Sequence, residues 1–325
     1  MALRKLATDD SAKDYISFVD AEVAAVERSL FTIQPLWCSF QGVTCGNFSG
    51  LSDYAKVLEI DLSRSSLIGS LPSSIGNFGN LTFFDIATNG IYGTIPSTIS
   101  GMRSVQHINI RSNTFDGSIP SSIGDCKDLE FVDLSFNSFT GSVPTSIGNL
   151  TKLSYLDLNF NSLTGSLPAS LVKLTSLISL DLSTNYIEGT IPSLITTFTL
   201  LKGLNLYNNK FVGTIPTSIG QLRRLEQLGL HLNFLTGTIP LGFSKMKQLS
   251  DLDLHFNYLT MGSAPRVDAS TFSNTTTAGL LDLSQNCLVY ISESYPLRNT
   301  NASHCLPPTR KYESEYDYVA SRSPS

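Results

Sequence analysis

Apolar and polar residues recur in a fixed 24-residue period from about Val57 to Leu249, without an insertion. In the unit 153–174, Leu156 and Leu158 alternate with polar and aromatic residues, which is the period of a strand with one buried face. Further apolar residues then follow at spacings of three or four. Each unit is therefore expected to form one short strand and an inward-facing return. The first apolar position of successive units is occupied by Leu81, Val105, Leu129, Leu153, Leu177, Leu201, Leu225 and Leu249.

Repetition at this length indicates a solenoid, in which each coil buries its apolar edge by stacking on its neighbours. Each coil supplies six or seven apolar side chains, and each stabilises the fold by roughly 1.5–3 kcal/mol when fully buried. Stacking alone is thus a sufficient driving force for folding. The expected functional site is therefore a long face that repeats from coil to coil, rather than a pocket.

Polar residues mark the turns of each coil. An asparagine recurs in the bend after each strand, and because buried polar groups need partners, we expect its side chain to bond to backbone groups of the next coil. Glycine and proline recur three apart, as at Gly165 and Pro168. Glycine permits positive φ and proline fixes φ, so each pair predicts a turn. The asparagine column comprises Asn89, Asn113, Asn137, Asn161, Asn185, Asn209, Asn233 and Asn257, with Ser65 in the first coil and Asn286 in the last.

These residues follow the pattern L-x-x-L-x-L-x-x-N-x-L-x-G-x-I-P, which resembles the plant-type leucine-rich repeat. That repeat is found in receptor-kinase ectodomains, receptor-like proteins and polygalacturonase-inhibiting proteins. The resemblance covers roughly Trp37 to Cys305. It implies an α/β repeat fold, a right-handed solenoid of about ten coils with a parallel β-sheet on its concave side, capped at both ends.

The period and its breaks divide the chain. Residues 11–31 place apolar side chains three or four apart, as in an amphipathic helix, and the period breaks where Asn257 and Asn286 lie 29 residues apart. We expect a disordered N-terminus (1–10), a helical and cysteine cap (11–56), leucine-rich repeats (57–260), an irregular loop (261–277), a last coil with a cysteine cap (278–308) and a disordered tail (309–325).

Four of the five cysteines flank the array, and the fifth, Cys126, occupies a column of apolar residues and is expected to be buried. The stretch from Trp37 to Cys45 resembles the N-terminal cysteine cap of the family. Metal binding by the flanking cysteines is the alternative, but no zinc-site spacing surrounds them. The preferred interpretation is two disulfides, Cys38–Cys45 and Cys287–Cys305, which imply an oxidising compartment.

Five N-x-S/T sequons agree with an extracellular, cell-wall or cell-surface location: Asn47, Asn80, Asn149, Asn274 and Asn301. The segment Met1–Ser11 is polar and charged, unlike a signal peptide. A start further upstream, unconventional export, or a cytoplasmic location with reduced thiols would each account for this. No run of eighteen apolar residues is present, so no membrane span is expected in this chain.

Composition excludes several classes of function. A net charge of −5 with 15% charged residues lacks the basic stripe of a nucleic-acid-binding protein. The sequence has no G-x-S-x-G, H-E-x-x-H, phosphate-binding glycine loop or kinase catalytic loop. We therefore expect no catalytic residues, no cofactor and no enzymatic activity.

Outward strand positions are the candidate binding residues, because side chains of a strand alternate between faces. One outward column is mostly aspartate, which we interpret as scaffold held by neighbouring hydroxyls. The stacked pair His231 and His255 could share a metal or act as a pH switch, but with no further ligand evident beyond Asp253 we predict no metal site. Exposed aromatic residues are typical anchors, unless the outermost pack beneath a neighbouring loop. The predicted binding residues are Phe83, His107, Arg111, Phe131, Phe136, Tyr155, Asn159, Phe160, Tyr207, His231, His255 and Phe256.

Together these features predict a non-catalytic recognition module that binds a peptide, protein or glycan on its concave face. The resemblance adds a defence, signalling or inhibitor role and a co-receptor as a further partner. Two alternatives stay open: the ectodomain fragment of a receptor-like protein kinase, and a structural wall or matrix protein.

Overall fold

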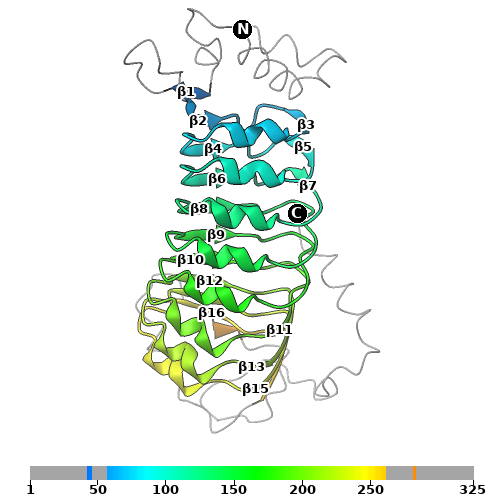
Figure 1. Ribbon diagram of the computed structural model, residues 1–325. Coiled ribbons are helices and arrows are strands. Elements are labelled where there is room, and N and C mark those ends of the chain that lie inside the picture. Colours follow the sequence, from blue (N-terminus) through cyan, green and yellow to red (C-terminus); the bar gives the residue numbers. More distant parts are fainter. Residues whose placement is uncertain (1–41, 46–56, 261–280, 283–325) are drawn as a thin grey trace, which may run out of the picture. The chain divides into compact units, whose positions relative to one another are not determined.

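The computed structural model describes residues 42–45, 57–260 and 281–282 (Figure 1). The predicted cap helix of residues 11–31, the irregular loop and the tail lie outside the described residues. Two compact units are distinguished, one comprising the chain up to Leu163 with Pro168–Leu177, the other Thr164–Leu167 with the chain from Ile178 onward. Each is a stack of coils of the kind that the 24-residue period predicts.

In the first unit, parallel strands place equivalent positions of successive repeats side by side. Phe83 therefore lies beside His107, and Phe131 beside Tyr155. Among the strands described in this unit, β1 alone is antiparallel to its neighbour, β2. The order in the sheet is β1 (Val43–Cys45), β2 (Val57–Asp61), β4 (Phe83–Asp85), β6 (His107–Asn109), β8 (Phe131–Asp133) and β9 (Tyr155–Asp157). A second row is formed by β3 (Ile68–Ser70), β5 (Gly90–Gly93) and β7 (Thr114–Phe115). The returns form the 3-10 helices η3 (Ser73–Asn77), η4 (Ser97–Gly101), η5 (Ser121–Asp125), η6 (Thr145–Asn149) and η7 (Ala169–Lys173).

The second unit repeats this plan. Its parallel strands are β10 (Ser179–Asp181), β12 (Gly203–Asn205), β14 (Gln227–Gly229), β16 (Asp251–Asp253) and β18 (Leu281–Asp282). Its second row is β11 (Glu188–Thr190), β13 (Lys210–Thr214), β15 (Phe234–Thr238) and β17 (Tyr258–Thr260). Its 3-10 helices are η8 (Ser193–Thr197), η9 (Thr217–Gln221) and η10 (Leu241–Lys245).

The core of each coil is the leucine set that the sequence predicts. Leu153 and Leu156 are fully buried, and so is Cys126, which confirms its predicted apolar role. Burial raises the pKa of the Cys126 thiol to about 12, with a smaller contribution from Asp125. The thiol is therefore protonated at neutral pH and acts as a small apolar side chain.

Asparagine side chains join adjacent coils, but in the opposite direction to the one expected. Asn161 Oδ1 accepts a hydrogen bond from Phe139 N at 3.0 Å, and its Nδ2 donates to Leu134 O at 3.0 Å. Both partners belong to the preceding coil. The prediction that these side chains bond to the next coil is wrong, because each asparagine side chain points toward the bend of the preceding coil.

The turns differ from the sequence prediction in one respect. The predicted glycine turns are confirmed, since Gly165 has a φ of 71°. The residue immediately before each asparagine also adopts positive φ although it is not glycine, as at Phe136 (52°) and Phe160 (49°). This conformation is unfavourable for bulky side chains, and the hydrogen bonds of the adjacent asparagine hold it in place.

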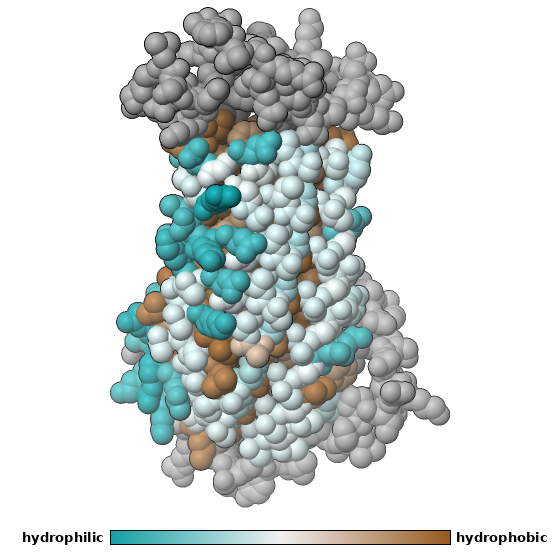
Figure 2. All heavy atoms as spheres, in the orientation of Figure 1, coloured by the Kyte–Doolittle hydropathy of each residue, from teal (hydrophilic) through white to brown (hydrophobic). Residues whose placement is uncertain are grey.

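The surface is weakly charged. On the face shown in Figure 2, residues of intermediate hydropathy predominate, and strongly hydrophilic residues form separate clusters. This appearance follows from the many serine, threonine and glycine residues in the returns.

Candidate functional site

A column of stacked rings covers the strand face of the first unit. Phe83 and His107 stack with ring centroids 4.3 Å apart, His107 and Phe131 at 4.2 Å, and Phe131 and Tyr155 at 4.4 Å, with interplanar angles of 15° or less. The in-register pairing of β4, β6, β8 and β9 places the four rings above one another. We call these four residues the aromatic ladder. Each of the four residues is half-buried, and within the ladder His107 and Phe131 have a ring against both faces.

His107 behaves as an aromatic member of the ladder. Among the residues that the structure describes, its buried Nε2 atom has no hydrogen-bond partner. Burial lowers the pKa of His107, although the carboxylates of Asp85, Asp133 and Asp61 oppose the shift. The ring is therefore neutral at pH 7, which suits a position between two phenylalanine rings.

A second aromatic pair lies at the ends of the same strands. Phe136 and Phe160 stack at 4.5 Å and are 43% and 40% exposed. Both side chains are therefore not covered by a neighbouring loop. Phe256 of the second unit is half-buried and meets the ring of His255 edge-on at 5.0 Å.

The aspartate column is structural wherever its carboxylates are buried. Asp133 is 3% exposed, and its Oδ1 accepts hydrogen bonds from Ser135 N at 3.0 Å and Ser135 Oγ at 2.6 Å. Asp157 is 7% exposed and accepts from Asn159 N at 2.9 Å and from the Tyr155 hydroxyl at 3.1 Å. These bonds agree with the interpretation that the column is scaffold.

The remaining predicted residues of the first unit differ in accessibility. Arg111 is exposed and Asn159 is half-buried. The backbone N–H of Arg111 donates to Asn109 Oδ1 at 3.2 Å, which fixes the backbone just beyond β6. Arg111 can therefore meet a ligand more readily than Asn159 can.

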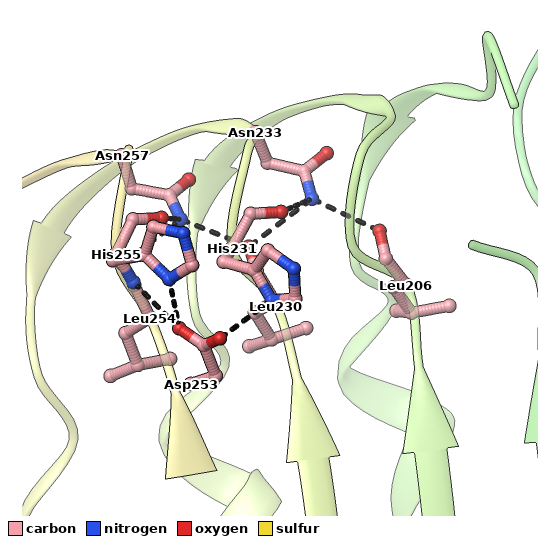
Figure 3. A network of polar contacts seen from close by, with 8 residues as sticks. All are labelled: Leu206, Leu230, His231, Asn233, Asp253, Leu254, His255 and Asn257. Carbon is pink, nitrogen blue, oxygen red and sulfur yellow. Dashed lines mark hydrogen bonds and ion pairs between the residues drawn. The ribbon is translucent and has the colours of Figure 1, made fainter. Parts of the chain in front are cut away.

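The second unit carries a polar cluster beside its own stack of rings. Tyr207 and His231 stack at 4.3 Å, and His231 and His255 at 4.6 Å. The carboxylate of Asp253 lies against both imidazoles (Figure 3): His231 Nδ1 is 3.1 Å from Asp253 Oδ2, and His255 Nδ1 contacts Asp253 Oδ1. We call His231, Asp253 and His255 the His–Asp–His cluster.

The electrostatics of this cluster favour an ionised carboxylate. Burial by itself raises the pKa of Asp253, but the hydrogen bond from His255 and the proximity of His231 outweigh it, and the pKa lies below its usual range. Neighbouring Asp251 has a raised pKa, because of partial burial and the charge of Asp253. Asp253 is therefore the carboxylate of this strand that is stabilised in its ionised form, and it lies between the two imidazoles.

The sequence predicted most members of these clusters without predicting their geometry. It singled out His231 and His255 as neighbours, but not that Asp253 would contact both rings. It did not predict the continuous ladder, although the 24-residue spacing of Phe83, His107 and Phe131 is a signal that could have found it.

The predicted modification sites divide into two groups. Asn80 and Asn149 are exposed, as glycosylation requires. Asn47, Asn274 and Asn301 lie outside the described residues, and so do Cys38, Cys287, Cys305 and the side chain of Cys45. Their predicted roles stay predictions.

Comparisons with known proteins agree with this fold. A family model described as leucine rich repeat matches residues 129–187, and a second leucine-rich-repeat model matches residues 104–126 and 200–222. Comparison with curated proteins by sequence gave no match. The in-register parallel strands, buried leucines and asparagine bends define this chain as a leucine-rich-repeat solenoid.

Solved structures of plant receptors are also similar to this chain. A plant peptide hormone receptor, RGFR1, in complex with RGF2 is 32% identical with a TM-score of 0.63, over 69% of this chain and 35% of that one. A TDR receptor is 32% identical with a TM-score of 0.62, over 68% and 38% of the two chains. The Arabidopsis receptor kinase HAESA, in complex with the peptide hormone IDA and the co-receptor SERK1, is 27% identical with a TM-score of 0.58, over 88% and 57%. The chain is a leucine-rich-repeat protein of the plant type.

The matched receptors are longer than this chain, which spans 35% of RGFR1 and 57% of HAESA as solved. Within residues 42–45, 57–260 and 281–282, no helix has the length and apolar character needed to cross a membrane.

Proposed function

We propose that this protein is a non-catalytic, extracellular recognition module that binds an extended peptide on its strand face. The aromatic ladder carries this proposal. Its four rings are stacked before any ligand arrives, so a ligand gains apolar contact without the cost of ordering them. Aromatic anchors of this kind supply most of the binding energy in many interfaces.

The dimensions of the ladder suit a short extended segment. The stacking distances extend the ladder over about 13 Å from Phe83 to Tyr155. An extended chain advances about 3.3 Å per residue, so about four ligand residues lie along it. Phe136 and Phe160 add an exposed apolar edge beside it, and Arg111 adds a cation for a carboxylate of the ligand.

The relatives support a peptide rather than a glycan. RGFR1 is solved with RGF2, and HAESA with a peptide hormone and a co-receptor. We extend to this chain both the peptide ligand and the prospect of a co-receptor, together with the extracellular location that such a ligand requires.

The test begins with an unbiased displayed peptide library, selected on the wild-type protein and followed by affinity measurement of one selected synthetic peptide. The double variant Phe131→Ala/Tyr155→Ala is expected to weaken binding at least about tenfold, as loss of anchor residues does. Tyr92→Ala is the matched control, because Tyr92 is a 53% exposed aromatic residue of β5 in the same unit but outside the ladder. Circular dichroism confirms that each variant is folded.

Two results would contradict the proposal. Equal affinity of the wild type and the ladder variant would show that the rings do not anchor the peptide. If the library yields no peptide and a plant glycan on an array binds the protein, the face would be assigned to carbohydrate instead.

The second candidate is the ectodomain of a receptor-like protein kinase. The similarity of 88% of this chain to the receptor kinase HAESA supports it. A transcript that continues into a membrane span and a kinase would establish this candidate. A purely structural wall or matrix role instead requires that the ladder substitutions leave every function of the protein unchanged.

A further inference from the structure

The strongest additional site lies in the second unit, apart from the aromatic ladder. We propose that His231, Asp253 and His255 bind a divalent transition-metal ion, with Zn²⁺ as the first ion to test. One ligand atom from each residue lies within 4.8 Å of the others. The inference does not rest on peptide binding, because the residues and the unit are different.

Distances within the cluster are close to those of a coordinated ion. Zinc binds imidazole nitrogen and carboxylate oxygen at about 2.0–2.2 Å, which brings neighbouring ligand atoms to about 3–3.6 Å from one another. His231 Nδ1 and Asp253 Oδ2 are already 3.1 Å apart, and His255 Nδ1 contacts the other carboxylate oxygen. The imidazole planes are 11° apart, so at least one ring must turn about its Cβ–Cγ bond for both lone pairs to meet the ion.

The donor set selects the class of ion. Two imidazoles and one carboxylate suit Zn²⁺, Cu²⁺ or Ni²⁺, whereas Ca²⁺ and Mg²⁺ prefer all-oxygen sites. Three protein ligands leave a position for water or for a group of a bound partner, as in zinc sites that are not purely structural. The side chains are 18%, 24% and 20% exposed in the order His231, Asp253, His255, so an ion can enter from solvent.

One departure from the repeat explains why the cluster exists here. In other coils, the aspartate of the outward column accepts from the residue two positions later in the same coil, as Asp181 does from Ser183. Gly229 replaces that aspartate in the coil of His231. A Cβ at this position would lie 2.9 Å from Asn205 Oδ1 and 3.2 Å from Tyr207 Cδ1, so the space is already taken.

His231 consequently has no carboxylate in its own coil and turns to Asp253 of the following coil. In-register pairing of β14 with β16 places Gly229 beside Asp253, and hence His231 beside His255. Tyr207 supports the outer face of the His231 ring at 4.3 Å. Figure 3 shows both imidazoles directed to one carboxylate beneath the bends of Asn233 and Asn257.

The experiment titrates ZnCl₂ into the full chain by calorimetry and compares single variants. His231→Gln, Asp253→Asn and His255→Gln are each expected to weaken the site at least about tenfold, since even the residues that orient metal ligands contribute that much. Asp251→Asn is the matched control, because it removes the same charge from the same strand, β16, without removing a ligand. Its affinity is expected to stay within about threefold of the wild type, because Asp251 is exposed and interactions between exposed charges are weak.

A Co²⁺ titration followed by visible absorption provides the second readout, with a ligand-field spectrum expected for the wild type and Asp251→Asn only. Equal Zn²⁺ affinity of the wild type and either histidine variant would overturn the proposal. An Asp251→Asn effect as large as that of Asp253→Asn would overturn it too, by showing general attraction to negative charge. If Asp253→Asn does not fold, the two histidine variants decide the question alone.

Discussion

A histidine enclosed by two phenylalanine rings cannot share the protonation behaviour of a histidine in water. His107 stacks on Phe83 and Phe131, and this burial holds its pKa below the usual 6.5 despite three nearby carboxylates. The neutral imidazole thus completes the ladder, and protonation would place a charge within it. At the residue scale, the ladder depends on this one ring staying uncharged.

The pH dependence of stability follows with a definite sign. Because the folded-state pKa of His107 is depressed, its contribution to the free energy of unfolding is present above pH 6.5 and is lost as the pH falls from 6.5 through the folded-state pKa. The variant His107→Phe keeps the stack and removes the titration. We expect the wild type to lose more stability than this variant between pH 7.5 and 5, by at most about 1.4 kcal/mol per pH unit.

Urea unfolding at both pH values measures this difference. All other titrating groups are common to the two proteins, so they cancel in the comparison. Parallel curves of stability against pH for the wild type and His107→Phe would contradict the assignment.

Between elements, the asparagine bends rather than the strands alone fix one coil to the next. Each strand is three to five residues long in most coils, which allows few ladder hydrogen bonds. The side chain of Asn161 adds one accepted bond from Phe139 N and donated bonds to Leu134 O and Leu158 O. It therefore satisfies backbone groups of two coils that water cannot reach.

Replacing this side chain tests the coil-to-coil role. Asn161→Ala leaves three buried backbone groups without their partner, and each such group costs about 1–3 kcal/mol. We expect a loss of at least about 2 kcal/mol in the free energy of unfolding, measured with urea. Asn149→Ala, at an exposed site in η6, is expected to change it by less than about 0.5 kcal/mol. Similar losses for the two variants would show that the asparagine bends are not special.

For the whole molecule, stability comes from apolar stacking and not from charge. Only 15% of the residues are charged. In the described part of the chain, the lysine–carboxylate bridges are Lys152 to Asp128 and Lys202 to Glu226, both with exposed side chains. Exposed pairs of this kind contribute about 0–1 kcal/mol each.

Stability is consequently expected to depend little on ionic strength. Raising NaCl from about 0.05 to 0.5 M shortens the range of charge interactions severalfold, yet we expect the free energy of unfolding in urea to change by less than about 1 kcal/mol. A fall of more than about 2 kcal/mol would mean that an ionic network contributes substantially.

The repeat was predictable because its signal is purely local. Leu156 and Leu158 predicted a strand, and Gly165 with Pro168 predicted a turn, since spacing and backbone preference act within a few residues. The direction of the asparagine bonds was not predictable, because either neighbouring coil offers backbone groups at the same sequence spacing. The positive φ of Phe136 and Phe160 was missed for a similar reason: the adjacent asparagine imposes it against the preference of phenylalanine.

The same distinction between local and tertiary determinants applies to the candidate sites. The amino-acid sequence by itself determined which side chains lie on the outward strand positions, because alternation and the 24-residue period depend only on order along the chain. Tertiary structure alone decided that Phe83, His107, Phe131 and Tyr155 form one stack, and that His231 turns to Asp253 of another coil. Those contacts depend on the register between strands and on the side chains of Asn205 and Tyr207 that fill the space beside Gly229, and both are set by neighbouring coils in three dimensions.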